Sequence, residues 1–411
     1  MASKFNPPQF LPPPTTLIAD PELIVNGGSP LSGHVTISGS KNSALPILAA
    51  TLCCAGSSNL KNVPCLSDTK TMVSILQSLG AQVMSFGGHI VVNTDGMLSV
   101  EPDLSEIGKL RVELRDGKGQ ARVSNGKGLT GVSFRLEYPS VGGIETPMMA
   151  ACMAEGKTVI SNAAQEPEII DLAAFLTNCG AVVEGAGTDT LLISGRRKLY
   201  GSEYSIMPDR IEAGTYMLAA PITRSCISIL HLSAVPRTIE DDLRGFSIKT
   251  NPFPGFPTDL QPLTMALLST CKGISVVEES VFENRMSHVT ELQKFGAKIQ
   301  HRGSTAMVYG KGNASPFCGS QVIATDLCGG MSLVLVGLAA EGITEISEIS
   351  HVDRGYESLE MKLQGLEGNV GKEGNGELVV GSVGKDAALG NGGNVTAAGK
   401  LGIAGNCGTV G

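Results

Sequence analysis

The sequence predicts an α/β protein built from copies of one supersecondary module, and two observations carry this prediction. The pair Gly-Ala recurs after three apolar helical stretches, at Gly80, Gly180 and Gly296, and an alternating, strand-like run follows each pair. Upstream of each of these helices, a stretch of small residues ends in glycine and leads into a strand. A fixed order of elements that returns along the chain is the mark of a repeat architecture. The predicted unit is therefore helix, strand, helix, Gly-Ala and hairpin.

The small-residue helix and the strand that follows it are expected at four places. These are Leu45–Gly56 before Asn59–Val63, Met148–Gly156 before Thr158–Asn162, Thr264–Gly273 before Ile274–Glu278, and Met331–Gly342 before Ile343–Ile349. The fourth copy continues into a helix at Tyr356–Leu366, and a separate strand is expected at His34–Ser38.

The spacing of the copies predicts that two modules are incomplete. The interval Gly296–Glu367 holds one module, whereas Gly80–Gly180 and Gly180–Gly296 are each longer than one module and shorter than two. We therefore expect six ancestral modules, of which four are complete and two are truncated.

The two longer intervals each contain a remnant. In the second, a half-module is visible, with a helix at Tyr216–Thr223 and a strand at Ile227–Leu232, but no Gly-Ala helix follows it. In the first, the chain passes from Leu110-Arg111 directly into the polar stretch Val112–Gly128.

Composition fits a folded α/β protein and argues against several classes of partner. With 411 residues, of which 42% are hydrophobic, the chain can bury one or two substantial cores. Its net charge of −8 argues against nucleic acid or an anionic membrane as the main partner. No apolar run reaches the length of a membrane span. The ten cysteines are scattered, without CxxC or His/Cys spacing, so we expect reduced thiols and no structural metal. No cofactor is expected either.

The repeats also suggest how the chain is divided. Residues 1–24 are expected to be a flexible lead-in, 40–209 one lobe, and 25–39 with 210–367 a second lobe. Residues 368–411 are Gly-rich without an aromatic residue, which predicts a disordered tail. Cytoplasm is the expected location, and an organelle stays open if the true N-terminus is longer. No pattern in the sequence predicts an oligomeric state.

Polar residues that suit an anion site stand where the small-residue helices begin. Helix N-termini present unpaired N–H groups, so several of them around one axis would bind phosphate or carboxylate. Lys41 adds a compact positive charge, and Arg354 adds a planar guanidinium group that suits phosphate. Each Ser or Asp at these starts is also an ordinary N-cap. Five such helix starts together with both cations favour the anion site. The five helix starts are at Ser40, Ser140, Asp209, Asp259 and Asp326.

Six collinear motifs resemble the UDP-N-acetylglucosamine enolpyruvyl transferases (1-carboxyvinyltransferases). They are Val35–Ala50, Asn162–Ile169, Pro208–Thr215, Phe256–Asp259, Val281–Arg285 and Asp353–Glu357. The resemblance spans about residues 25–366 apart from the two gaps. It implies a two-lobed, inside-out α/β barrel of the enolpyruvate transferase type, with three βαβαββ modules in each lobe. Asn42, directly after Lys41, is typical of the amino-sugar branch rather than of the related shikimate-pathway enzymes.

The resemblance implies transfer of enolpyruvate from phosphoenolpyruvate to the 3′-hydroxyl of UDP-N-acetylglucosamine, the first committed step of peptidoglycan precursor synthesis. Such a reaction needs a base at the sugar hydroxyl, cations around the phosphate and an acid for the enol methylene. By the resemblance, Asp259 lies beside the attacking hydroxyl, and Lys41 and Arg354 act in catalysis by holding phosphoenolpyruvate, which Asn42 also binds. The positions implied for the nucleotide sugar are Asn42, Arg111, Tyr138, Ser140, Val141, Asp259 and Val281.

The chain also departs from the family pattern at two places. The family carries a mobile loop with a Cys or Asp general acid, and a cationic contact to the phosphate, after the position of Arg111. The stretch Val112–Gly128 contains no Cys. Where the family has Asp-Leu-Arg, this chain has Cys328 after Asp326-Leu327. Two alternatives stay open: a working transferase in which another group is the acid, or a catalytically dead relative that only binds nucleotide sugar.

Overall fold

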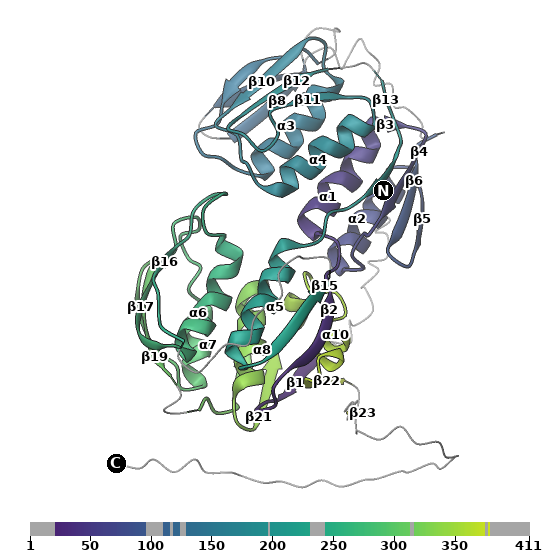
Figure 1. Cartoon of the computed structure of the whole chain (residues 1–411). Coiled ribbons are helices and arrows are strands. Elements are labelled where there is room, and N and C mark those ends of the chain that lie inside the picture. The colour runs from purple at the N-terminus through teal and green to yellow at the C-terminus, as the bar shows by residue number, and fades with distance from the viewer. Residues whose placement is uncertain are drawn as a thin grey trace, which may run out of the picture. The chain divides into compact units, whose positions relative to one another are not determined.

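Four sheets in the computed structural model share one strand pattern (Figure 1). The structure describes residues 21–95, 110–115, 118–123, 129–195, 198–230, 243–312, 316–374 and 377–378. For 110–123 and 372–378 it describes the backbone alone. The described residues all belong to one unit, Met1–Gly381. None of the helices among them is both long and apolar enough to cross a membrane.

Each complete module has one added strand beside its central strand. In three copies the added strand precedes the first helix of the module, and in the first copy it comes from a distant segment of the chain. In every copy, the central strand pairs in parallel with the added strand. On its other side it pairs antiparallel with the last strand of the module in three copies, and with a strand from the start of the chain in the fourth. The first copy consists of α1 (Lys41–Ala50), β4 (Ser57–Lys61), α2 (Ser67–Ser78), β5 (Gln82–Phe86) and β6 (His89–Asn93), with β14 (Glu203–Ser205) added. The second consists of α3 (Gly142–Met153), β10 (Lys157–Ser161), α4 (Pro167–Asn178), β11 (Val182–Glu184) and β12 (Thr190–Ser194), with β9 (Ser133–Arg135) added.

The other two complete copies follow the same order. One consists of α6 (Gln261–Thr270), β17 (Lys272–Glu278), α7 (His288–Lys294), β18 (Lys298–Arg302) and β19 (Thr305–Lys311), with β16 (Ile248–Lys249) added. The last consists of α8 (Leu327–Ala339), β21 (Ile343–Ser347), α10 (Leu359–Gly365) and β22 (Asn369–Gly374), with β20 (Gln321–Ile323) added and β23 (Glu377–Leu378) at the edge. Its final strand is supplied by the start of the chain, as β1 (Glu22–Asn26) lies between β21 and β22.

The first helix of each module lies inside, and the sheets lie outside. Every residue of α6 is buried, and so is α8 from Cys328 to Leu338. A helix that is apolar all round can only be stable in such a buried place. The sheets instead alternate, so that Thr158 and Ile160 of β10 are buried while their neighbours are partly or fully exposed. Buried hydrophobic residues form two clusters, one within residues 44–206 and one from 23–37 with 213–370.

The predicted half-module is present as α5 (Arg210–Ile222) and β15 (Cys226–Leu230). Strand β15 pairs in parallel with β2 (Ser32–Thr36), so this module shows its added strand and its central strand. The stretch after Leu110-Arg111 forms a hairpin of β7 (Leu110–Arg115) and β8 (Lys118–Val123). The strands β3 (Cys54–Ala55) and β13 (Leu199–Tyr200) form a further short parallel pair.

Several predicted boundaries need correction. The lead-in was expected to reach residue 24, but β1 begins at Glu22, and Leu23 is buried. The disordered tail was expected from residue 368, but β22 occupies Asn369–Gly374; residues 379–411 lie outside the described residues. Helix α5 starts at Arg210, directly after the helix start predicted at Asp209 and earlier than the predicted range Tyr216–Thr223.

Close backbone contacts recur at one position of the module. Gly131, Gly201 and Gly319 each stand two residues before the added strand. A Cβ there would lie between 2.1 and 2.3 Å from the carbonyl oxygen of the first residue of the central strand. No side chain fits at that distance, so the added strand can approach the central strand only through glycine.

We expect Gly319→Ala to be strongly destabilising, because its Cβ would lie 2.2 Å from the Ile343 oxygen. Overpacking of this kind should lower the free energy of unfolding by about 1–3 kcal/mol in urea titrations. Gly365→Ala is the matched control, since nothing lies within 4 Å of its Cβ position in α10. That control should be neutral or stabilising by up to about 1 kcal/mol. Equal effects of the two substitutions would contradict the close-contact interpretation.

Candidate active site

Two adjoining cavities contain almost all of the polar residues singled out from the sequence. The larger has a volume of about 940 Å³ and the smaller of about 490 Å³. Both are lined by the same four side chains, which therefore lie at the junction between them. These are Asn42, Asp259, Val281 and Phe282.

The helix starts around the larger cavity are mostly capped by their own side chains. Asp326 Oδ1 accepts from Cys328 N at 3.0 Å and from Gly329 N at 2.9 Å, and Asp209 Oδ1 caps α5 in the same way. Ser40 Oγ likewise accepts a hydrogen bond at the start of α1. Asp259 differs. It lies in a 3₁₀ turn, η2 (Thr258–Leu260), and its carboxylate pairs with a side chain instead of capping the helix.

Two cations on different modules are brought together by one carboxylate. Lys41 is the first residue of α1, and Arg354 follows the short helix α9 (Ser350–Asp353). Asp68 Oδ2 lies 3.4 Å from Lys41 Nζ, and Asp68 Oδ1 lies 3.1 Å from Arg354 Nε. Burial alone would raise the pKa of Asp68, but the hydrogen bond from Arg354 and the charge of Lys41 outweigh it and lower that pKa. Both cations line the larger cavity and Asp68 does not, so it holds them from behind.

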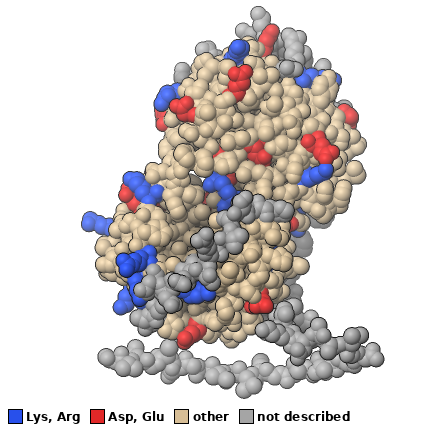
Figure 2. Space-filling model, in the orientation of Figure 1, with Lys and Arg blue, Asp and Glu red and all other residues tan. Residues whose placement is uncertain are grey.

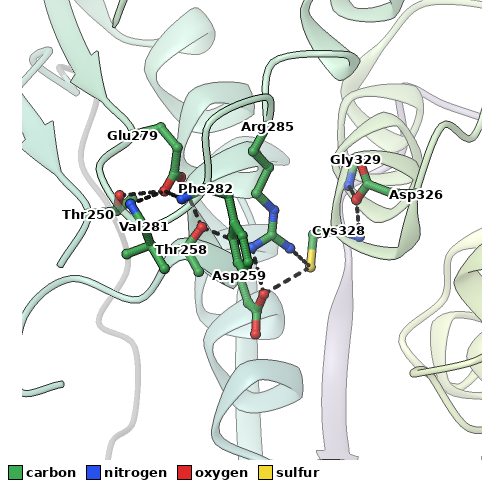
Figure 3. Close-up of polar contacts among 10 residues, drawn as sticks. All are labelled: Thr250, Thr258, Asp259, Glu279, Val281, Phe282, Arg285, Asp326, Cys328 and Gly329. Carbon is green, nitrogen blue, oxygen red and sulfur yellow. Dashed lines mark hydrogen bonds and ion pairs between the residues drawn. The ribbon is translucent and has the colours of Figure 1, made fainter. Parts of the chain in front are cut away.

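Asp259 belongs to a compact polar cluster in the larger cavity (Figure 3). Arg285 Nη1 lies 2.8 Å from Asp259 Oδ1, and Arg285 Nη2 donates to Cys328 Sγ at 3.2 Å. The Cys328 thiol in turn points to Asp259 Oδ1 at 3.9 Å. Burial and the nearby Asp259 charge raise the pKa of Cys328 to about 12, so this sulfur is a neutral thiol at pH 7.

The smaller cavity is lined by aromatic rings that remain accessible. Tyr138, Phe253 and Phe282 are 47%, 36% and 54% exposed, in a chain with only 4% aromatic residues. The Arg210 guanidinium lies 5.8 Å from the Phe253 ring centroid and is paired with Glu168 at 2.9 Å. Exposed aromatic rings suit the flat face of a planar ligand.

Most of the residues predicted from the sequence meet in these cavities. Lys41 and Arg354 line the larger cavity. Four further predicted residues lie at the junction or line the smaller cavity. Those four are Asn42, Tyr138, Ser140 and Val141, beside the shared Asp259 and Val281. Arg111 is in β7, but its side chain is outside the described residues, so its role stays a prediction.

Sequence reasoning missed three contributors to the site. Asp68 lies in the first turn of α2, where it reads as an ordinary helix-start acid. Arg285 stands inside a quoted motif, yet its partner Asp259 is distant in sequence. Phe253 follows Asn251-Pro252, and nothing local links it to Tyr138.

Charged groups are sparse on the face of the molecule drawn in Figure 2. Most of the face drawn in Figure 2 is uncharged, in keeping with a chain of 17% charged residues.

The fold and the two cavities define the class of protein. Solved structures with a similar fold include the enolpyruvyl transferase NikO from Streptomyces tendae, with a TM-score of 0.74 and 21% identity, covering 87% of this chain and 100% of that one. EPSP synthase from Acinetobacter baumannii has a TM-score of 0.65 and 16% identity, covering 86% and 100%. The profile of EPSP synthase (3-phosphoshikimate 1-carboxyvinyltransferase) matches residues 25–108, 102–243 and 233–363. The architecture is thus the two-lobed α/β fold of the enolpyruvyl transferases.

Two relatives that are similar in sequence identify the family within this class. UDP-N-acetylglucosamine 1-carboxyvinyltransferase 2 of Carboxydothermus hydrogenoformans is 41% identical, over 84% of this chain and 97% of the relative. UDP-N-acetylglucosamine 1-carboxyvinyltransferase of Gloeobacter violaceus is 42% identical, over 87% and 92%. The chain belongs to the UDP-N-acetylglucosamine 1-carboxyvinyltransferase family.

Glu145 in the smaller cavity makes stability depend on pH. Burial and then the neighbouring Glu168 raise its pKa to about 7. As pH rises from the ordinary carboxyl range toward 7, the unfolded chain releases this proton while the folded chain keeps it, so stability falls. Glu145→Gln should therefore raise the melting temperature at about pH 8 and change it little at about pH 4. Glu184→Gln, at an exposed position, is the control; a pH-independent gain for Glu145→Gln would contradict the assignment.

Proposed function

We propose that this chain binds phosphoenolpyruvate and UDP-N-acetylglucosamine and transfers enolpyruvate to the 3′-hydroxyl of the sugar. The observation that carries this proposal is the junction of the two cavities. Asn42 and Asp259 stand between a cavity with paired cations and a cavity with exposed rings. A reaction that joins a phosphate ester to a nucleotide sugar needs those two environments side by side.

Phosphoenolpyruvate fits the larger cavity. Lys41 and Arg354 are held at one place by Asp68, so they can stabilise the phosphate both when it binds and when it leaves. Arg285 adds a third cation near the junction, where it is paired with Asp259.

The nucleotide sugar fits the smaller cavity. Tyr138, Phe253 and Phe282 offer faces for a base, and the sugar would then extend toward the junction. There the Asp259 carboxylate is placed to take the proton of the 3′-hydroxyl as its oxygen attacks C2 of phosphoenolpyruvate. In that step the methylene carbon C3 takes a proton from an acid and becomes a methyl group. The C2–O bond to phosphate then breaks while C3 gives a proton back to a base, which restores the double bond and releases phosphate.

A proposal of impaired turnover has its own support. The alignments with two relatives are 411 and 409 residues long. Only 84% of this chain takes part in either alignment, so each alignment is longer than the part of this chain that it contains. The relatives therefore carry residues opposite which this chain has none, and this supports two truncated modules. Where the resemblance implies an arginine, Cys328 is a buried thiol of raised pKa. The second candidate function is accordingly binding of nucleotide sugar alone. Loss of a general acid costs roughly 10²–10⁴ in rate.

Phosphate release from the two substrates separates the candidates. In a working transferase, Asp259→Asn should abolish release and leave affinity for UDP-N-acetylglucosamine within about tenfold, or roughly 1.4 kcal/mol. We expect the parent chain to turn over at least about a hundredfold more slowly than the Carboxydothermus relative assayed beside it. A parent rate equal to that of the relative would rule out the impaired-turnover proposal. Absence of both release and sugar-nucleotide binding would rule out both candidates.

Lys41→Ala should weaken binding of phosphoenolpyruvate or inorganic phosphate far more than binding of UDP-N-acetylglucosamine. The reason is that the Lys41 ammonium lines the larger cavity and not the smaller one. Isothermal titration of each ligand measures the difference. Lys61→Ala is the control, because Lys61 is paired with Glu203 on the surface and lines neither cavity. Equal losses for both ligands in Lys41→Ala would refute the assignment.

A further inference from the structure

We propose that Glu279 is a positioning residue that sets the orientation of Arg285, and through it of Asp259, by way of the Thr258 hydroxyl. The inference rests on the proposed function, since it assigns a support to the group that would accept the substrate proton. Glu279 follows the last residue of β17, is 2% exposed, and lines neither cavity.

The Glu279 carboxylate receives four hydrogen bonds. Its Oε1 accepts from the Val281 and Phe282 backbone N–H groups at 2.9 and 3.1 Å, and from Thr250 Oγ1 at 2.8 Å. Its Oε2 accepts from Thr258 Oγ1 at 2.9 Å (Figure 3). A buried carboxylate is costly without such partners, and here both oxygens are satisfied.

This arrangement fixes the direction of the Thr258 proton. A carboxylate can only accept, so Thr258 must donate its single hydroxyl proton to Glu279. The lone pairs that remain on Thr258 Oγ1 face Arg285, whose Nη1 donates to them at 2.9 Å. The same Nη1 lies 2.8 Å from Asp259 Oδ1. Arg285 is thus aligned by one hydroxyl and one carboxylate, and the hydroxyl is aligned by Glu279.

Glu279 also shapes the wall of the smaller cavity. The backbone groups that it holds belong to Val281 and Phe282, which line both cavities. The Phe282 ring lies 5.3 Å from the Arg285 guanidinium. One buried carboxylate therefore fixes two sides of the junction.

Glu279→Gln tests the inference because it changes polarity while keeping shape. The Gln oxygen can replace Oε1 and keep its three donors, whereas the amide nitrogen must donate to Thr258 Oγ1. The Thr258 proton then turns toward Arg285, where two donors oppose each other. Thr258→Val removes the hydroxyl altogether, and Thr258→Ser keeps it as the conservative control.

Arg285 can be followed without any turnover. Full-length protein is treated with phenylglyoxal, which modifies arginines, and the rate at Arg285 is read by peptide mass spectrometry relative to Arg210 in the same sample. We expect Glu279→Gln and Thr258→Val each to raise the Arg285 rate about fivefold, and Thr258→Ser to match the parent. The double variant Glu279→Gln, Thr258→Val should be no more reactive than either single variant, since both act through one hydroxyl.

The outcomes separate this inference from the proposed function. An unchanged Arg285 rate in folded Glu279→Gln, or additive effects in the double variant, would overturn the inference. A raised, non-additive rate in a parent chain that releases no phosphate would uphold the positioning role and count against the transferase. Where phosphate is released, Glu279→Gln should lower kcat about tenfold and leave KM for UDP-N-acetylglucosamine within about twofold, because the Val281 and Phe282 contacts are kept.

Discussion

Burial of the central helices is the constraint from which the rest of this structure follows. Helix α6 is buried along its whole length and α8 nearly so, which forces the sheets to the outside. A buried helix still has unpaired N–H groups at its start, and these need caps or a cavity. Asp326 and Asp209 supply caps, while the start of α6 carries Asp259 into the larger cavity. The site thus lies where the polar N-terminal ends of several packed small-residue helices come close to one another.

Ion pairs then fix the charged side chains near these helix ends. Asp68 joins two cations from separate modules, and Arg285 joins Asp259 to a neutral thiol. Each pair alone is the kind of contact that contributes little on a surface. At the larger cavity, the same pairs fix cations beside the Asp259 carboxylate, which is the arrangement that release of phosphate from an enol ester requires.

Local patterns in the sequence were sufficient for much of this picture. The Gly-Ala pairs, the small-residue helices and the half-module ending in β15 could all be predicted, because each depends on neighbouring residues. Motifs that resemble a family predicted Lys41 and Asp259 as site residues, and both line the larger cavity. Contacts between distant residues could not be predicted: neither Asp68 with Arg354 nor β1 with β22 has a local signal. Because β1 pairs with β22, both strands are ordered, and for this reason the predicted lead-in and the predicted tail were each too long.

The position of β1 dictates the order in which the chain can fold during synthesis. Strand β1 leaves the ribosome first, yet both of its partners, β21 and β22, lie near the end of the described chain. The hydrophobic cluster within residues 44–206 needs no later segment and can form early, whereas the cluster of 23–37 and 213–370 cannot close until almost everything is made. Throughout that interval, β1 carries unpaired backbone groups and the apolar side chains of Leu23 and Val25. A nascent chain of this topology therefore depends on protection of its first strand until the last module arrives.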